Sequence, residues 1–267
     1  MPNLIHPTAI IDPTAELAAD VSIGPYAYVG PQVSLARGVK IGHGASIDAL
    51  TSIGEDTQIW PQAAVGMAPQ DLKYAGEDSR LEIGARCMIR EFSSLHRGTA
   101  GGGMLTRIGD DVLIMNGAHV GHDANIGDHC IIAAHSALGG HVALGRYAII
   151  GGMTAVHQWV RVGAHAMVGA GAFISQDVPT YGLIKDGGEG LAGVNITGLK
   201  RRGFDREAIG AITAAMKILF LERNEHPLST ALAQARVDYG EHPAVQDLLK
   251  FVESAGEKSK RRGFVSV

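Results

Sequence analysis

An aliphatic residue recurs at every sixth position through most of this 267-residue chain. In its first part these positions are Ile5, Ile11, Leu17, Ile23, Val29, Leu35, Ile41, Ile47, Ile53, Ile59 and Val65. The period returns over 83–95 and again over 108–174. A helix repeats about every 3.6 residues and a simple strand every two, so neither explains a strict six. Short strands joined by tight corners do, and we predict a parallel β-helix of hexapeptide repeats.

The residue four positions after each aliphatic one is small or β-branched, as at Ala9, Ala15, Val112 and Ala118. We expect both positions to face the interior of a narrow prism. The composition agrees, because the chain has 36 glycines and only 5% aromatic residues, against a usual glycine share of about 7%. Gly, Asn and Asp between the strands would accept the positive φ of tight corners.

The period is interrupted over 66–82 and over 96–107. Both segments are polar and contain glycine, which is typical of functional surface loops. We therefore expect two loop insertions that leave the coil, and we look for the chemistry near them.

The six-residue period ends after Pro179, and 180–204 is glycine-rich and is predicted to be irregular. A helical period follows. Its helix starts are indicated by Asp205 as an N-cap and by Pro227 and Pro243 at the first turns of two further helices. We therefore divide the chain into a β-helix of residues 1–183 and a small α-helical C-terminal domain of residues 184–267.

Charge and cysteine content exclude several classes of protein. A net charge of −4 gives no general attraction to nucleic acid. Cys87 and Cys130 are too few and too far apart for a disulfide framework or a thiolate zinc site, which favours a reducing compartment. The start of the chain has no secretory signal, and no apolar stretch reaches about 18 residues. We expect a cytoplasmic protein with no transmembrane segment and no nucleic-acid partner.

Four of the twelve histidines lie in phase with the coil. The positions that must stack, each eighteen residues after the last, are Val120, Leu138 and Val156. The histidines that follow or precede them at the same edge are His119, His122, His141 and His157. These imidazoles should project on three successive levels, which makes this edge the best candidate for a site.

Clustered histidines can serve as zinc ligands or as a general base. Zinc requires nitrogens at about 2.0–2.1 Å from one ion, which is hard within one chain when levels are about 4.8 Å apart. A base requires one imidazole poised near neutral pH, and Asp123 could orient the ring of His122. General base catalysis is the first interpretation, and a metal site is the alternative.

Four segments carry a resemblance to a known family: HVGHDANIGDHCIIAAHSALGGHVALG, AIIGGMTAVHQWVRVGAHAMVGAG, PQDLKYAGEDSRLEIG and GVNITGLKRRGF. They resemble the UDP-N-acetylglucosamine 3-O-acyltransferases, which are hexapeptide-repeat acyltransferases, and the resemblance spans residues 4 to about 222. It implies a left-handed coil and a homotrimer with active sites between adjacent prisms. It also implies transfer of an (R)-3-hydroxyacyl chain from acyl carrier protein to the 3-hydroxyl of UDP-N-acetylglucosamine, the first step of lipid A biosynthesis, without a cofactor or a catalytic metal.

The resemblance assigns roles to individual residues. His122 would be the general base, Asp123 its orienting group, and the N–H of Gly140 the oxyanion donor. The residues expected to contact substrate or line the cleft, some of them from the neighbouring subunit, are Asp71, Lys73, His96, His119, His141, His157, Gln158, Asn195 and Arg202.

Two further features concern the acyl donor. Ala170 aligns with a position that limits acyl-chain length in the family. The segment KRRGFDR carries a local excess of positive charge, and Lys200, Arg201 and Arg206 are expected to dock the acidic carrier protein.

The sequence leaves three alternatives open. Thr197 stands where the family usually has Glu, and the stretch 180–192 also differs, so an acceptor with an amino group in place of the 3-hydroxyl is one alternative. A zinc-dependent lyase on the same prism is another. A purely structural hexapeptide protein is the third, but it would not need the QDLKYAGE and GLKRRGF motifs.

Overall fold

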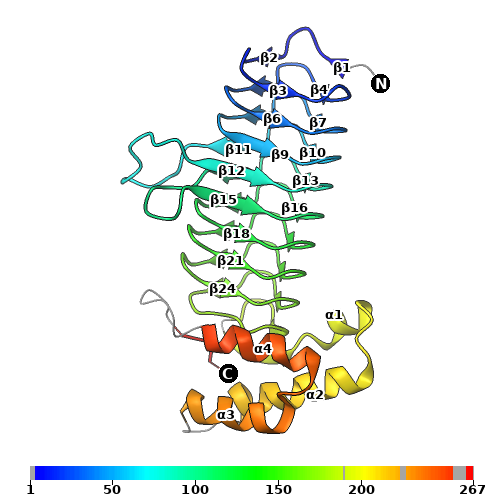
Figure 1. Cartoon of the computed structure of the whole chain (residues 1–267), viewed down its shortest axis with the longest axis vertical. Coiled ribbons are helices and arrows are strands. Elements are labelled where there is room, and N and C mark those ends of the chain that lie inside the picture. Colours follow the sequence, from blue (N-terminus) through cyan, green and yellow to red (C-terminus); the bar gives the residue numbers. More distant parts are fainter. Residues whose placement is uncertain (1–3, 189, 223–226, 255–262, 267) are drawn as a thin grey trace.

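The structure is a computed structural model that describes residues 4–188, 190–222, 227–254 and 263–266. The chain forms a left-handed parallel β-helix that carries a layer of helices at its C-terminal end (Figure 1). The hexapeptide period therefore predicted the fold class correctly.

Three parallel sheets form the faces of the prism in the described part of the chain. The first face consists of β1 (Leu4–Ile5), β4 (Ser22–Ile23), β7 (Lys40–Ile41), β10 (Gln58–Ile59), β13 (Met88–Ile89), β16 (Leu113–Ile114), β19 (Ile131–Ile132), β22 (Ile149–Ile150), β25 (Met167–Val168), β27 (Gly182–Ile184) and β28 (Leu191–Val194). The second consists of β2 (Ile10–Ile11), β5 (Tyr28–Val29), β8 (Ser46–Ile47), β11 (Ala64–Met67), β14 (Ser94–His96), β17 (His119–Val120), β20 (Ala137–Leu138), β23 (Ala155–Val156) and β26 (Phe173–Ile174). The third consists of β3 (Glu16–Leu17), β6 (Ser34–Leu35), β9 (Thr51–Ile53), β12 (Arg80–Ile83), β15 (Leu105–Ile108), β18 (Asn125–Ile126), β21 (Ala143–Leu144) and β24 (Arg161–Val162).

The register of the second face confirms the predicted stacking. Val120 pairs with Leu138, and Leu138 pairs with Val156. All three side chains are buried. Since each coil adds one strand to each face, residues eighteen apart lie directly above one another, and the aliphatic positions form a continuous core.

The corner between the second and third faces, called here the site corner, has left-handed backbone at residues other than glycine. Asp123, His141 and Trp159 have φ values of 58°, 62° and 71°. Hydrogen bonds between successive coils hold this conformation, because His141 N donates to His122 O at 2.8 Å and Trp159 N donates to Gly140 O at 3.1 Å. Bulky side chains therefore occupy corners where the sequence analysis expected Gly, Asn or Asp.

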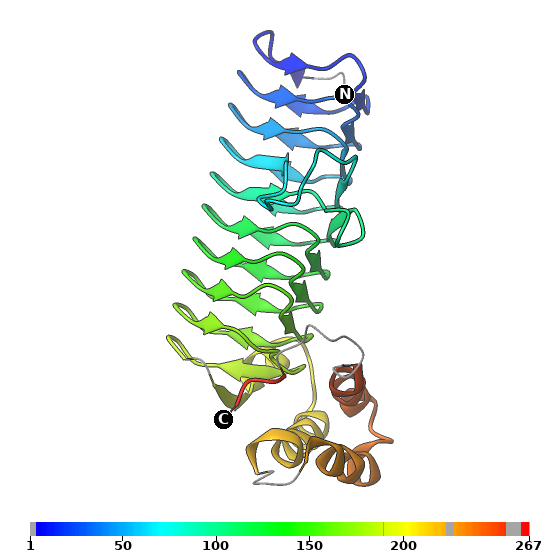
Figure 2. The same cartoon turned by 90° about the vertical axis from the view of Figure 1, so that its left-hand side faces the viewer.

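Both insertions leave the prism at the site corner, on consecutive coils. The first insertion, residues 68–79, connects β11 to β12, and the second insertion, residues 97–104, connects β14 to β15. Figure 2 shows the two lying next to each other on one side of the prism. The next coil carries His122 at the same corner.

The C-terminal region differs in part from the prediction. The segment 180–204, expected to be irregular, contains β27, β28 and the short helix α1 (Ile196–Arg201). The six-residue period is absent because β28 turns back antiparallel to β27, and the Asn195 side chain then accepts from Gly198 N at 3.0 Å to start α1.

The later helices begin where the sequence indicated. They are α2 (Arg206–Met216), which continues into the π-helical turn η1 (Lys217–Leu221), α3 (Leu228–Tyr239) and α4 (Pro243–Glu253). Asp205 caps α2 by accepting from Ala208 N at 2.7 Å, and Pro243 is the first residue of α4. Among the helices of the described residues, none has both the length and the apolar character needed to cross a membrane.

Candidate active site

His122 and Asp123 form a hydrogen-bonded pair at the site corner. Nδ1 of His122 lies 2.7 Å from Oδ2 of Asp123, and their side chains are 13% and 1% exposed. An ionised carboxylate only accepts hydrogen bonds, so Nδ1 carries the proton and Nε2 has its lone pair available. The sequence placed these residues side by side along the chain, and the left-handed backbone at Asp123 turns both side chains to the same side of the corner.

The carboxylate of Asp123 has further donors that the sequence analysis missed. The backbone N–H and the hydroxyl of Thr99, in the second insertion, both bond to it. The backbone N–H of Asp123 bonds to Thr106 Oγ1 at 2.7 Å. The only available signal for Thr99 was its place inside an insertion, since that segment has no period to set its phase.

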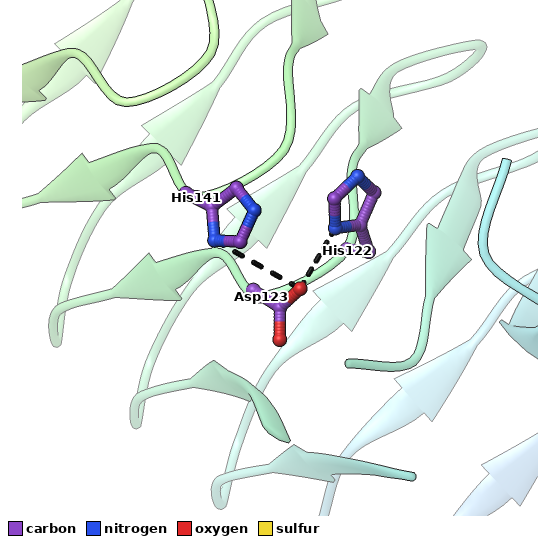
Figure 3. Close-up of side chains that lie close together, drawn as sticks. All are labelled: His122, Asp123 and His141. Atoms are coloured by element: carbon purple, nitrogen blue, oxygen red, sulfur yellow. Dashed lines mark hydrogen bonds and ion pairs between the residues drawn. The ribbon is translucent and has the colours of Figure 1, made fainter. Parts of the chain in front are cut away.

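His141 joins this pair from the next coil. Its ring packs edge-on to the ring of His122, with centroids 4.9 Å apart, and its Nδ1 lies 3.8 Å from Oδ2 of Asp123. Figure 3 shows both imidazoles turned toward the carboxylate. Trp159 stacks on the other face of His141 at 3.7 Å. The sequence analysis missed Trp159, although its position eighteen residues after His141 marks the same corner.

A cavity of about 430 Å³ lies between the insertions and the site corner. Its lining comes from both insertions and from three successive coils: Asp71, Lys73, Glu77, Thr99, Ala100, Gly101, His122, His141, Gln158 and Trp159. The structure therefore brings together five residues that the sequence analysis selected, namely Asp71, Lys73, His122, His141 and Gln158.

Gly140 lies against the free edge of the His122 ring. A Cβ placed on Gly140 would be 2.5 Å from Nε2 of His122. The carbonyl of Gly140 accepts from Trp159 N, whereas its N–H has no acceptor among the described residues. An unpaired N–H beside the nitrogen that would take up a proton has the placement required of an oxyanion donor.

His96 and His119 lie outside the lining of the cavity. Nδ1 of His96 is 2.7 Å from the carbonyl of Ala68 at the start of the first insertion, and its ring is 5.0 Å from that of His119. Burial lowers the pKa of both imidazoles, that of His119 to about 4. Both are therefore neutral at neutral pH, and they support the base of the first insertion. The ring of His157 bonds to the carbonyl of Gln158 and also lies outside the lining.

Asn195 and Arg202 lie at a different corner, between the third and first faces. Asn195 caps α1 and donates from Nδ2 to His165 O at 2.9 Å. Arg202 donates from Nη2 to Tyr147 O at 2.9 Å and lies over the Tyr147 ring. Within one chain neither residue reaches the cavity, so their predicted nucleotide contacts require a neighbouring subunit and stay predictions.

Ala170 occupies the third corner, between the first and second faces. It is exposed, and its N–H donates to Asp186 Oδ1 at 2.9 Å. It is thus also outside the cavity of its own chain, and its role in acyl length stays a prediction about the assembled enzyme.

The side chains that could hold a metal are the same three that form the pair and its neighbour. One ligand atom from each of His122, Asp123 and His141 lies within 4.8 Å of the other two. Oδ2 of Asp123 already accepts from Thr99 and His122. The geometry is therefore that of a hydrogen-bonded base, and a metal would have to displace those donors.

The fold and this site define a hexapeptide-repeat transferase. The family described as "Bacterial transferase hexapeptide (six repeats)" matches residues 105–140, and "Udp N-acetylglucosamine O-acyltransferase; Domain 2" matches residues 177–265. Relatives named acyl-[acyl-carrier-protein]–UDP-N-acetylglucosamine O-acyltransferase include one from Myxococcus xanthus, 45% identical over 94% of this chain and 96% of that protein. One from Xanthomonas campestris is 47% identical over 94% of this chain and 95% of that protein.

Solved structures agree with the sequence relatives. LpxA from Acinetobacter baumannii has a TM-score of 0.93 at 38% identity and covers 98% of this chain and 99% of its own. UDP-N-acetylglucosamine O-acyltransferase from Moraxella catarrhalis has a TM-score of 0.91 at 35% identity, covering 97% and 99%. The chain belongs to the acyl-[acyl-carrier-protein]–UDP-N-acetylglucosamine O-acyltransferase family, and it is an acyltransferase.

Proposed function

We propose that this enzyme transfers an (R)-3-hydroxyacyl chain from acyl carrier protein to the 3-hydroxyl of UDP-N-acetylglucosamine, the first step of lipid A biosynthesis. The observation that carries the proposal is the His122–Asp123 pair, whose proton lies on Nδ1 and whose Nε2 is left free beside a cavity. The membership of the family supports the substrates.

The transfer needs one proton acceptor and one oxyanion donor. Nε2 of His122 removes the proton from the acceptor hydroxyl as its oxygen attacks the thioester carbonyl. The N–H of Gly140 donates to the oxyanion of the tetrahedral intermediate. When the C–S bond breaks, the imidazolium returns the proton to the leaving thiolate of the carrier. Asp123 holds the required tautomer and stabilises the imidazolium while it exists.

The acceptor is held by residues around the pair. Asp71 and Lys73 on the first insertion contact the sugar, and Gln158 contacts the nucleotide. In a homotrimer, Asn195 and Arg202 of the adjacent subunit add contacts to the UDP group, where a guanidinium suits phosphate because its planar fork donates two bonds at once.

The carrier protein docks on the C-terminal domain. A groove of about 800 Å³ lies along α1 and α2, and its lining includes Lys200, Arg206 and Lys217 beside Ile196 and Phe204. This pairing of cationic and apolar side chains suits an acidic partner with an exposed apolar ridge. Arg201, exposed on α1, extends the positive surface.

The reaction as proposed needs no cofactor, since the carrier thioester supplies the activated acyl group. We place the enzyme in the cytoplasm, and the two cysteines support this choice because Cys87 and Cys130 are both free and buried. Thr197 is exposed on α1, and the choice between a hydroxyl and an amino acceptor is left to experiment.

An acyl-transfer assay tests the proposal. Purified enzyme is given 3-hydroxyacyl carrier proteins with UDP-N-acetylglucosamine or with its 3-amino analogue, after elemental analysis and treatment with a chelator. We expect transfer to the 3-hydroxyl that survives chelation. No transfer to either sugar would contradict the proposal, transfer to the amino sugar alone would change the acceptor, and a stoichiometric metal whose removal abolishes activity would favour metal chemistry at His122, Asp123 and His141.

A further inference from the structure

Thr99 completes the hydrogen bonding of the Asp123 carboxylate. Its backbone N–H donates to Oδ1 at 2.9 Å and its hydroxyl to Oδ2 at 2.6 Å. Oδ2 is the oxygen that accepts from His122. A carboxylate that is 1% exposed depends on protein donors in place of water. The two bonds from Thr99 therefore set the rotation of the carboxylate, and with it the direction in which Oδ2 meets His122.

The second insertion is built to bring Thr99 to this position. The carbonyl of Thr99 accepts from Gly102 N at 3.0 Å and from Met104 N at 2.9 Å, which closes a tight turn. Gly102 lies directly on the carboxylate, because a Cβ at this position would overlap Asp123. The turn thus covers Asp123 and excludes water from it.

Glu77 ties the first insertion to the second. Its Oε1 accepts from Ala100 N at 2.8 Å, next to Thr99, and its Oε2 accepts from Ala75 N at 2.9 Å within its own insertion. These backbone donors hold the pKa of Glu77 below its ordinary value, so it stays ionised. The same insertion carries Asp71 and Lys73 into the cavity.

A continuous chain of bonds therefore runs from the first insertion through Glu77, Ala100 and Thr99 to Asp123 and His122. We infer that Thr99 is a positioning residue for the base and that Glu77 is a clasp that couples the acceptor-binding insertion to it. The part that names the acceptor rests on the proposed function. Contact of the sugar with the first insertion orders Glu77 and Ala100, and this order keeps Thr99 on Asp123 and the proton of His122 on Nδ1.

The role of Thr99 is tested with Thr99→Val, which removes the hydroxyl but keeps the shape and the backbone donor. We expect kcat to fall by about tenfold or more with KM changed by less than about twofold, since the lost bond is one to a charged group. Thr99→Ser should restore most of kcat. The matched control is Thr154→Val, whose buried hydroxyl donates to Gly169 O at 2.9 Å far from the pair; it should affect stability and leave kcat unchanged.

A second readout needs no substrate. In protein labelled with ¹⁵N-histidine, the signals of His122 are identified by their loss in His122→Ala, and their shifts report which ring nitrogen carries the proton. The wild type should show the Nδ1–H tautomer, and Thr99→Val a mixture of tautomers. A folded Thr99→Val variant with wild-type kcat and an unchanged tautomer would overturn the inference. If the wild type transfers no acyl group to the sugar, the proposed function fails, and the tautomer still decides the role of Thr99.

The clasp is tested with Glu77→Gln, which replaces one accepting oxygen with an amide NH₂ that cannot accept. The adjacent Asp78→Asn is the matched control, because it makes the same charge change at an exposed position. By hydrogen exchange, peptides of the second insertion should exchange at least threefold faster in Glu77→Gln and unchanged in Asp78→Asn. Exchange unaffected by Glu77→Gln would overturn the clasp, and this variant remains informative if Thr99→Val fails to fold.

Discussion

Gly140 lies so close to His122 that a single added carbon on Gly140 would come within 2.5 Å of Nε2. The nitrogen that would take up a proton and the N–H that would bind the oxyanion are therefore neighbours on consecutive coils. Their spacing is set by the distance between stacked strands, about 4.8 Å. The prism thus places base and oxyanion donor with the rigidity of its own backbone.

The first prediction concerns the base itself. His122→Ala should lower kcat by about 10²–10⁴-fold, the usual contribution of general base catalysis. The fold should survive, because the side chain lies at a corner and outside the aliphatic core. Steady-state kinetics together with circular dichroism measure both effects. Near-normal turnover in the folded variant would rule out His122 as the base.

Gly140→Ala should lower kcat by about tenfold or more while the protein still folds. The new methyl group would meet the ring of His122, which can rotate away, so the cost falls on the geometry of the base. Gly152→Ala is the control, because its Cβ would lie at an ordinary 3.3 Å from its nearest neighbour, Ala134 O, at another corner. Equal kcat values in the two variants would contradict the role of Gly140.

The carrier-docking surface predicts a salt-sensitive KM. Arg201→Glu or Arg206→Glu should raise the KM for the acyl carrier protein by about fivefold or more, the equivalent of about 1 kcal/mol. Added salt should raise the wild-type KM, because exposed charges are screened within about 8–10 Å. Arg37→Glu, 75% exposed on the opposite part of the prism, is the control. A KM for the carrier that ignores both charge reversal and salt would exclude this surface.

Acyl-chain selectivity should respond to residue 170. Ala170→Gly should move the preferred 3-hydroxyacyl chain to a longer one and Ala170→Met to a shorter one, with each misplaced methylene costing about 1–3 kcal/mol. The exposed corner of Ala170 lies outside the cavity of its own chain, so the effect depends on an adjacent subunit. Competition between carrier-linked chains of graded length measures it. One shared optimum for all three proteins would make Ala170 an ordinary corner residue.

Stability should fall with acid because of His165. Burial, with smaller effects of Arg202 and Arg146, lowers the pKa of this imidazole to about 4. The unfolded chain, with a histidine pKa near 6.5, binds the proton first as pH falls. The stabilisation is therefore complete above about pH 6.5 and is lost between about pH 6.5 and 4, at most about 2 kcal/mol per subunit.

His165→Phe should remove part of this pH dependence. Phenylalanine keeps the ring contacts with Tyr147 and Phe204 and does not titrate. His129→Phe, whose side chain is 41% exposed at the same corner, is the control. Chemical unfolding at pH 7 and pH 4.5 gives the comparison. An equal loss of stability in wild type and His165→Phe would show that other groups cause it.

Much of this protein could be predicted from its sequence because the β-helix is nearly one-dimensional. Each residue contacts the one eighteen positions away, so the period alone predicted the three faces, the stacking of Val120 on Leu138 and the shared edge of His122 and His141. The helix starts at Asp205 and Pro243 followed from local capping chemistry.

The contacts of the insertions were decided only by the tertiary structure. The bonds from Thr99 to Asp123 and from Glu77 to Ala100 join segments 24 and 23 residues apart. No period relates these segments, so their phase cannot be read along the chain. The convergence of His122 and Asp123 likewise depends on the backbone at the corner. A repeat sets the distance between coils, but a loop outside the repeat takes its position from the side chains that it happens to meet, and those contacts exist only in the folded chain.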